Sequence, residues 1–588
     1  MKGRGTPQVR LRAGFILIAI VLSIFGARLV QLQAIDPHAY ADAAREADLR
    51  TIDLPATRGQ ILDRNGEPLA DSVAGLMVVA DPALTKATAA PLAKFLSNKL
   101  GIDYFSTLTA LRGKKENSRY EYVARRIPAT KASEAVQAAE ELGYEGLTTE
   151  RDPIRNYPGG DLAANIVGFV GTDESLGGIE RSFDATLAGK DGQETFVMAA
   201  GGTRVPLGES STVAPINGQD ITTTIDRDAQ WYTSKVLAEA ASNSGAESAI
   251  AVALDTRTGE VLALADWPTF DANNPSIAKK ADRGARSLSD VYEPGSVQKV
   301  LTMSALIDAG KVTNRTKLTV PNTLSRQDRT IHDWFDHPTK RWTLAGVMAQ
   351  SSNIGTVLAS DKFEKGQLRS YLARFGLGQR TGLGLSGESA GILASDAAWN
   401  SQIQDRITFG QSVSVNAVQM AAAVNAVANG GVKVSPSLIK GSATNAAGQL
   451  VGTDHATTER VVSAEAARQT MQMMERVVDP ATGTAAKARV AGYRVAGKTG
   501  TAQRANAKLG RYDGTLTVSF GGFAPADDPR FTVYVVVQNP KTNQGGGSNA
   551  GPVFSRIMSF LLRRYGVAPT GTKPSHLPVE WGKGALKY

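Results

Sequence analysis

A serine and a lysine three positions apart, Ser296 and Lys299, are the first residues in this chain whose types and spacing could perform covalent chemistry. A serine hydroxyl is a poor nucleophile until a nearby base accepts its proton. A lysine can accept that proton only if burial or a neighbouring cation lowers its pKa. The pair therefore predicts acyl transfer through a serine ester, provided that both side chains share one face of a helix.

The residues that follow the pair favour such a helix. Val300, Met303, Leu306 and Ile307 keep helical spacing, and Pro294-Gly295 is typical of a turn that leads into a helix. Ser296 would then lie at the helix start, where backbone N–H groups can stabilise a developing oxyanion. Taken alone, however, S-x-x-K is a weak signal that a solvated helix can carry by chance.

Two further segments complete a possible site. Ser351-Ser352-Asn353 follows a helical stretch that begins near Thr343. Lys498-Thr499-Gly500-Thr501 follows residues 493–497, whose apolar alternation predicts a strand. Further strands are predicted over 515–520 and 531–537, so the K-T-G segment would lie on an antiparallel sheet. The three segments follow one another in this order, and each has the expected local structure.

The elements that must position these residues begin near residue 218. The segment 226–241 starts with Asp226, a suitable N-cap, and continues with helix-forming residues. Strands are predicted over 249–255 and 260–265, which is how an α/β sandwich with an antiparallel sheet could begin. Residues 34–225 contain turn signals, a predicted two-residue hairpin turn at Asn65-Gly66 and a helical stretch over 131–142, so we expect a mixed α+β module.

The N-terminus predicts a membrane anchor. Residues 13–27 contain no charge, and a helix that continues past Arg28 to about Ile35 would be long enough to span. Four basic residues and no acidic one precede this segment, which places the N-terminus in the cytoplasm and the rest of the chain outside. The alternative is a cleaved signal peptide, although no convincing A-x-A-like cleavage site follows the apolar core.

Charge and composition exclude other classes of site. The net charge of +9 divides into +4 over residues 1–12, +4 over residues 563–588 and about +1 between them, so no folded domain offers the basic face of a nucleic-acid binder. The chain has no cysteine, which excludes disulfides and thiolate zinc sites. Its five histidines are scattered, and we expect neither a metal nor a cofactor.

The combination of S-x-x-K, S-x-N and K-T-G resembles the signature of penicillin-binding proteins and serine β-lactamases. The rest of the chain resembles class B penicillin-binding proteins in the segments 58–66, 155–158, 177–180, 292–295, 375–382 and 387–388. The septal, FtsI-type branch is the best match. Two departures are Val297-Gln298, where Thr-Phe is usual, and Ser412, where glycine often follows Gly410-Gln411.

The resemblance implies an α+β fold with a single transmembrane helix, an elongated pedestal and a transpeptidase domain that combines a five-stranded antiparallel sheet with an all-α subdomain. The expected divisions are a cytoplasmic tail (1–12), an anchor (13–35), a pedestal of the penicillin-binding protein dimerisation type (36–225), a transpeptidase domain (226–565) and a C-terminal tail (566–588).

The resemblance also implies a reaction, the cross-linking of peptidoglycan stem peptides that end in D-Ala-D-Ala. Ser296 would be the nucleophile and Lys299 its base, while Ser351 would relay a proton and Asn353 would orient Lys299 and the substrate. Lys498 and Thr499 would bind the substrate carboxylate, and Lys498 would help to keep Lys299 neutral. Gly500 and Thr501 complete the substrate-binding segment, and the N–H groups of Ser296 and Thr501 would form the oxyanion hole.

Implied partners are β-lactam antibiotics, which would acylate the same serine, a glycosyltransferase of the SEDS type and other division proteins of the membrane. Three alternatives stay open on the sequence alone: a rod-elongation enzyme of the same class, a β-lactamase, and a non-catalytic β-lactam sensor or scaffold.

Overall fold

The computed structural model describes residues 7–31, 49–171, 174–197, 210–506, 510–542 and 544–582. Helix α1 (Pro7–Val30) contains the stretch Leu11–Val30, which is long and apolar enough to cross a membrane, and its apolar side chains are exposed. This agrees with an anchor, because a helix that is apolar on all its faces is typical of a membrane span or a buried core. The predicted extension to Ile35 lies outside the described residues.

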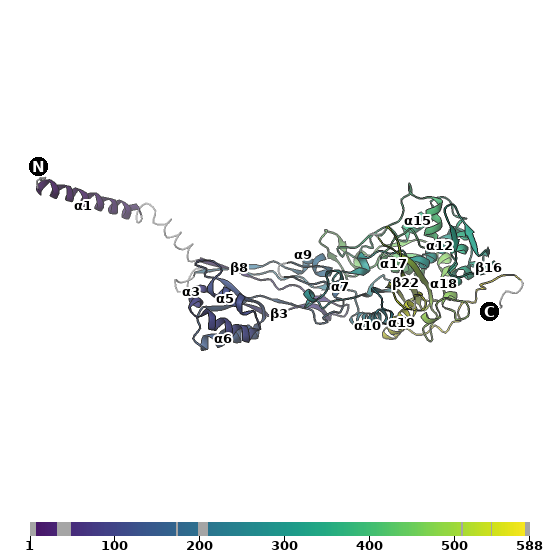
Figure 1. The fold of residues 1–588 in the computed structure, drawn as a ribbon, viewed down its shortest axis with the longest axis horizontal. Helices are drawn as coiled ribbons and strands as arrows, with labels where there is room; N and C mark the ends of the chain where they lie inside the picture. Colours follow the sequence, from purple (N-terminus) through teal and green to yellow (C-terminus); the bar gives the residue numbers. More distant parts are fainter. Residues whose placement is uncertain are drawn as a thin grey trace.

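An elongated module made mostly of antiparallel ribbons follows α1 in the chain (Figure 1). One of its sheets has the order β1 (Leu49–Leu54), β8 (Gly192–Val197), β9 (Ser210–Val213). A second sheet has the order β10 (Ile221–Thr222), β2 (Ile61–Leu62), β3 (Pro68–Val73), β7 (Ile154–Asn156). The predicted hairpin at Asn65-Gly66 is present and joins β2 and β3. Its loop is longer than the predicted two residues, since the backbone hydrogen bond that closes it runs from the Asp63 N–H to the Glu67 carbonyl oxygen.

A small head, at the end of this module that is remote from the C-terminal half of the chain (Figure 1), has a hydrophobic core of its own, which includes Val78, Leu92 and Leu111. Its sheet has the order β5 (Glu121–Pro128), β4 (Gly75–Ala80), β6 (Leu147–Arg151). Its helices are α3 (Pro82–Thr85), α4 (Ala89–Leu100), α5 (Tyr104–Arg112) and α6 (Ala129–Glu141). The helix predicted over 131–142 is therefore confirmed as α6.

Near the C-terminal domain, the module is held by one buried carboxylate. Glu180, on α8 (Gly178–Ser182), accepts hydrogen bonds from the guanidinium Nε atoms of Arg58 and Arg155, at 2.6 and 2.7 Å. The hydroxyl of Tyr157 donates to the same carboxylate at 3.3 Å. The segments 58–66, 155–158 and 177–180, which are distant in sequence, thus meet at a single ion-pair cluster. Short helices α7 (Ala164–Val167) and α9 (Asp184–Leu187) flank it.

The C-terminal domain is built on a five-stranded antiparallel sheet. Its strands lie in the order β12 (Val261–Trp267), β11 (Ser248–Asp255), β23 (Phe531–Gln538), β22 (Arg511–Ala524), β21 (Ala496–Asn506). The sequence predicted that the K-T-G segment follows a strand over 493–497. That boundary was wrong, because β21 begins at Ala496 and the K-T-G segment lies within it, paired with β22.

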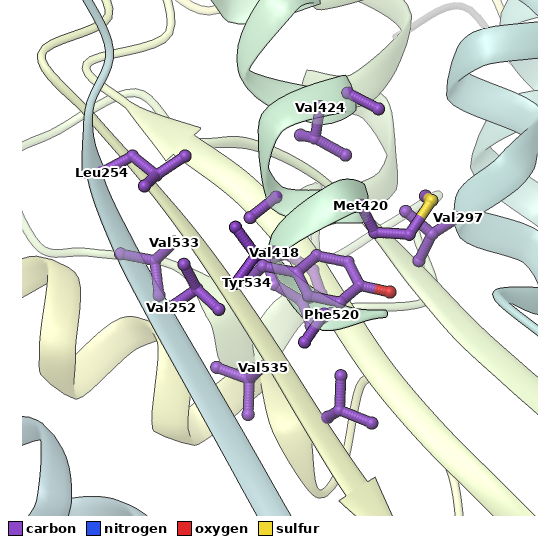
Figure 2. Packing of buried hydrophobic residues seen from close by; sticks show 14 of the residues in the cluster. Val252, Leu254, Val297, Val418, Met420, Val424, Phe520, Val533, Tyr534 and Val535 are labelled. Atoms are coloured by element: carbon purple, nitrogen blue, oxygen red, sulfur yellow. The ribbon is translucent and has the colours of Figure 1, made fainter. Parts of the chain in front are cut away.

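Two layers of helices cover this sheet. Helices α10 (Arg227–Ser244) and α19 (Ala550–Arg564) pack on one face, and α17 (Ala417–Ala428) and α18 (Ala464–Val478) pack on the other. Figure 2 shows Tyr534 of β23 among Val418 and Met420 of α17, with its register partner Val252 of β11 nearby. As the sequence predicted, α10 starts after Asp226, whose carboxylate accepts from the N–H groups of Asp228 and Ala229.

An all-α subdomain completes the C-terminal domain and carries two of the three chemistry-bearing segments. Besides α17 and α18, its helices are α12 (Gln298–Asp308), α13 (Leu344–Gln350), α14 (Asn353–Ser360), α15 (Gln367–Arg374) and α16 (Ser401–Thr408). A small antiparallel pair, β13 (Lys317–Val320) and β16 (Lys340–Thr343), leads directly into α13. The fold is therefore the α+β arrangement that the resemblance implied.

Candidate active site

Three segments that are distant in sequence line one cleft, which has a volume of about 590 Å³. Ser296 comes from the start of the α12 region, Ser351 and Asn353 from the junction of α13 and α14, and Thr499 and Thr501 from β21. Lys299 and Lys498 lie directly behind this surface and are completely buried. The structure thus brings together all the residues that the sequence predicted for the site.

Ser296 is half-buried in a single turn of 3₁₀ helix, η5 (Gly295–Val297), that runs into α12. The prediction that it lies at a helix start is confirmed, with Lys299 one turn further on. Within the described part of the chain, no residue forms a hydrogen bond with the Ser296 hydroxyl. The hydroxyl is therefore not engaged by another described side chain and is open to the cleft.

The amine of Lys299 is held by the S-x-N segment. Its Nζ donates to the carbonyl oxygen of Ser351 at 2.5 Å and to Oδ1 of Asn353 at 2.8 Å, and the Ser351 hydroxyl lies at 3.4 Å. Burial lowers the pKa of Lys299 to about 7, against a weaker opposing effect of the Asp333 carboxylate. A substantial fraction of this amine is therefore neutral at neutral pH, as a proton acceptor must be.

Lys498 faces the same hydroxyl from the sheet. Its Nζ donates to Oγ of Ser351 at 2.8 Å and to the carbonyl and hydroxyl oxygens of Thr499, both at 3.1 Å. Burial, together with the positive charge of Lys299, holds the pKa of Lys498 well below its usual range. Two ammonium groups in one buried pocket disfavour each other, so these two lysines titrate as a pair joined through Ser351.

Gly500 allows β21 to pack against the turn that carries the nucleophile. A Cβ atom at this position would lie 2.2 Å from the Ser519 hydroxyl and 2.9 Å from the carbonyl oxygen of Pro294. Any side chain would therefore separate the strand from the Ser296 turn. Thr501, one residue further, lines the cleft together with Ser296.

Asp333 is a residue of the site that sequence reasoning missed. Its side chain is completely buried and accepts hydrogen bonds from the N–H groups of Asn353 and Ile354, at 2.6 and 3.1 Å. It also accepts from the Ser352 hydroxyl at 2.7 Å and contacts His337 at 3.0 Å. The carboxylate thereby holds the first turn of α14, where a negative charge is favourable, and fixes the backbone of Asn353. No spacing in the sequence connects Asp333 with this helix.

The outer walls of the cleft come from segments that carried no signal either. The exposed Trp334 is oriented by a hydrogen bond from its indole to the Gln350 carbonyl oxygen, at 2.9 Å. Phe409, Thr484 and the glycines 545–547 line the remaining walls. These wall residues are distributed over more than 200 positions of the sequence, so only the tertiary fold brings them together.

Comparisons with known proteins agree with this geometry. The family profile described as the penicillin binding protein transpeptidase domain matches residues 249–559, and that of the penicillin-binding protein dimerisation domain matches residues 53–223. The second match argues against the β-lactamase alternative, because that alternative does not account for the module before the catalytic domain.

Individual relatives match over almost the whole chain. The penicillin-binding protein PbpB of Mycolicibacterium smegmatis is 36% identical, over 95% of this chain and 90% of its own length. The peptidoglycan D,D-transpeptidase FtsI of Escherichia coli is 31% identical, over 98% and 95%. The solved structure of penicillin binding protein 3 from Mycobacterium tuberculosis, complexed with aztreonam, superposes with a TM-score of 0.69 at 31% identity, covering 90% of this chain and 100% of that one. The chain belongs to the class B penicillin-binding proteins and is a serine peptidoglycan D,D-transpeptidase.

Proposed function

We propose that this protein cross-links stem peptides ending in D-Ala-D-Ala during septal wall synthesis, with Ser296 as the acylated nucleophile. The observation that carries the proposal is the arrangement of two buried amines, Lys299 and Lys498, on either side of the Ser351 hydroxyl. This arrangement supports the roles of a proton acceptor for Lys299, a relay for Ser351 and a carboxylate-binding amine for Lys498 around one half-buried serine.

In the first half-reaction, Ser296 Oγ attacks the penultimate D-Ala carbonyl carbon while its proton passes to Lys299. The N–H groups of Ser296 and Thr501 stabilise the oxyanion of the tetrahedral intermediate. The C–N bond to the terminal D-Ala then breaks, and the leaving amine receives a proton through Ser351. Lys498 and Thr499 bind the terminal carboxylate. Asn353, which accepts from Lys299 at 2.8 Å, orients the base.

In the second half-reaction, the amine of a neighbouring stem peptide attacks the ester carbonyl and gives up a proton through Ser351 to Lys299. The bond to Ser296 Oγ then breaks, and Lys299 passes a proton to that oxygen, which restores both groups. We infer that β-lactams acylate Ser296 as well, since they present an acyl carbon and a carboxylate to the same groups. The similar Mycobacterium tuberculosis protein has been solved in complex with aztreonam, which supports this inference.

Labelling with a fluorescent penicillin tests the assignment of the nucleophile. We expect Ser296→Ala to lose covalent labelling while its circular dichroism spectrum and melting temperature stay close to those of the parent. The exposed Ser106→Ala, in the head, is the matched control and should label fully. Undiminished labelling of Ser296→Ala, or a penicilloyl adduct mapped to another peptide, would refute the role.

We further propose a domain plan of a cytoplasmic tail (1–12), a single-pass anchor (13–35), a pedestal (36–225), an extracytoplasmic transpeptidase domain (226–565) and a C-terminal segment. Helix α1 and the two matched family profiles support these divisions. Mass spectrometry of the protein isolated from membranes tests the anchor: residues 1–35 should be present, and an N-terminus beyond them would indicate cleavage instead.

The septal role rests on the resemblance of the motif segments to the FtsI-type branch, and an elongation role is the competing assignment. Membrane partners, namely a glycosyltransferase of the SEDS type and division proteins, follow from the septal role. A fluorescent fusion at the native locus should concentrate at mid-cell before constriction. A distribution along the side wall would support the elongation role instead.

A further inference from the structure

The segment 566–582, which we call the C-terminal strap, leaves α19 and runs back across the C-terminal domain. Its first part is fixed near α18 and β21. The Tyr493 hydroxyl donates to the Val567 carbonyl oxygen at 2.5 Å, Arg494 donates to the Thr572 hydroxyl at 2.7 Å, and the Ser575 N–H donates to Glu475 at 2.9 Å.

The last part of the strap adds an extended segment to the free edge of β16. The Thr343 N–H donates to the Val579 carbonyl oxygen and the Trp581 N–H donates to the Arg341 carbonyl oxygen, both at 3.0 Å. Leu577 and Val579 are 5% and 4% exposed, while the residues between and after them are less buried. This alternation is typical of a strand with one face in the core.

Trp581 fastens the end of the strap. Its indole N–H donates to the Leu318 carbonyl oxygen at 3.0 Å. Its ring lies 5.7 Å from Nζ of Lys317 and 5.5 Å from Cζ of Arg341, the distances of cation–π contacts. The strap end is therefore joined to both β13 and β16.

The strap also contacts the first turn of α13 as closely as a backbone can. The Thr343 hydroxyl, which caps α13 by accepting from the Gly346 N–H at 3.1 Å, donates to the Pro578 carbonyl oxygen at 2.5 Å. A Cβ atom at Gly346 would lie 1.9 Å from the Val579 carbonyl oxygen. Glycine within a helix costs about 1 kcal/mol relative to alanine. Here the close approach of the strap requires it.

Helix α13 connects this contact with the active site. The strap is seated at its N-terminal end, and Ser351 is its C-cap, with a left-handed φ of 58°. A helix of seven residues is only about 10 Å long, so its first and last turns adjoin each other. Any tilt at Gly346 is therefore transmitted to the Ser351 carbonyl and hydroxyl, which receive the hydrogen bonds of Lys299 and Lys498.

We propose that strap residues 577–581 are positioning residues for acylation: they fix α13 and, through it, the orientation of Ser351 towards the two lysines. The inference deepens the proposed function and rests on acylation at Ser296. Displacing a reacting group by about 1 Å can cost about 10²-fold in rate. Residues 577–581 contact β13, β16 and α13 and are not among the residues that line the cleft. The loss should therefore appear in the acylation step rather than in the initial binding of the penicillin.

The experiment compares two variants with the parent: Trp581→Ala, and a chain truncated after His576 that is otherwise complete. Stopped-flow acylation by a fluorescent penicillin separates the dissociation constant of the initial complex from the acylation rate constant. Below the melting temperature of every variant, we expect the rate constant to fall tenfold or more and the dissociation constant to change less than about twofold. Ending the chain after Gly582, which keeps every contact described above, is the matched control and should leave both values unchanged.

Gly346→Ala tests whether the effect passes through α13. In the full-length chain this substitution should lower the acylation rate constant, because its methyl group displaces Val579. In the chain ended after His576 it should have no further effect on that rate constant, and it should raise the melting temperature because alanine favours the helix. The inference would be overturned if Gly346→Ala lowered the acylation rate constant by the same factor in the full-length and the truncated chain. It would also be overturned if Trp581→Ala acylated at the parental rate. An unlabelled parent would overturn the proposed function itself.

Discussion

At the scale of single residues, the catalytic proposal depends on the protonation of Lys299. Burial in the cleft lowers its pKa to about 7, while Asp333 opposes this and Lys498 faces it across Ser351. The neutral amine is the competent base, so acylation should fall as the pH decreases through about 7. We expect an acid limb centred near that pH when the second-order rate constant for a fluorescent penicillin is measured from pH 5.5 to 9. A flat profile over this range would exclude Lys299 as the titrating base.

Also at the scale of single residues, the side chain of Gln298 lowers the free energy of unfolding. It is completely buried, and within the described residues neither its amide oxygen nor its amide nitrogen has a hydrogen-bond partner. A buried amide without a partner costs about 1–3 kcal/mol. Gln298→Leu, which keeps the volume, should therefore raise the free energy of unfolding by about 1 kcal/mol in urea denaturation. The exposed Gln137→Leu should change it by less than about 0.5 kcal/mol, and a destabilised Gln298→Leu would show that the amide is satisfied.

At the scale of elements, the junction of α13 and α14 is held by Asp333. Removing the charge with Asp333→Asn deprives the Ser352 hydroxyl and the N–H groups of Asn353 and Ile354 of a carboxylate acceptor. We expect acylation to slow by tenfold or more. Because Asp333 raises the pKa of Lys299, its loss should also move the acid limb to lower pH.

The exposed Asp336→Asn, in the same loop, is the matched control for this charge removal and should keep both the rate and the profile. An acid limb that moves to higher pH in Asp333→Asn would contradict the proposed electrostatic role. A stability loss without any change in acylation kinetics would restrict Asp333 to a structural role.

At the scale of the whole molecule, the module and the C-terminal domain carry separate tasks. At their junction they share one hydrophobic core, which includes Ile61 and Phe183 of the module, and Arg64 pairs with Glu260 at 2.9 Å and donates to the Tyr565 hydroxyl at 3.0 Å. The Glu180 cluster, in contrast, lies within the module, and breaking a buried ion pair by removing one partner costs about 3–5 kcal/mol.

Glu180→Ala should therefore lower the melting temperature in scanning calorimetry. We expect penicillin acylation to stay within about twofold of the parent, because Ser296 and its partners lie in the other domain. The exposed Glu174→Ala is the control and should leave the thermogram unchanged. Loss of acylation at a temperature where the C-terminal domain remains folded would show that the two parts are coupled more tightly than these contacts indicate.

Much of the fold and site could be predicted because local patterns encode them. The N-cap Asp226, the helix over 131–142 and the placement of Ser296 one turn before Lys299 follow from neighbours a few positions apart. The start of β21 was misplaced because the alternation at 493–497 is apolar like a strand, yet ladder pairing with β22 begins only at Ala496. Ser412 has a left-handed φ of 57°, which accounts for the glycine usual at that position.

Local patterns were sufficient to predict the order of the three motif segments, the reaction class that their resemblance implies, and one apolar N-terminal helix. The set of groups that surround the serine depends on long-range packing. Asp333, Trp334 and the strap act through contacts between positions far apart in the chain, and no local periodicity records them. The shift in the pKa of Lys299 likewise arises from burial, which exists only once the sheet and the helices have packed around it.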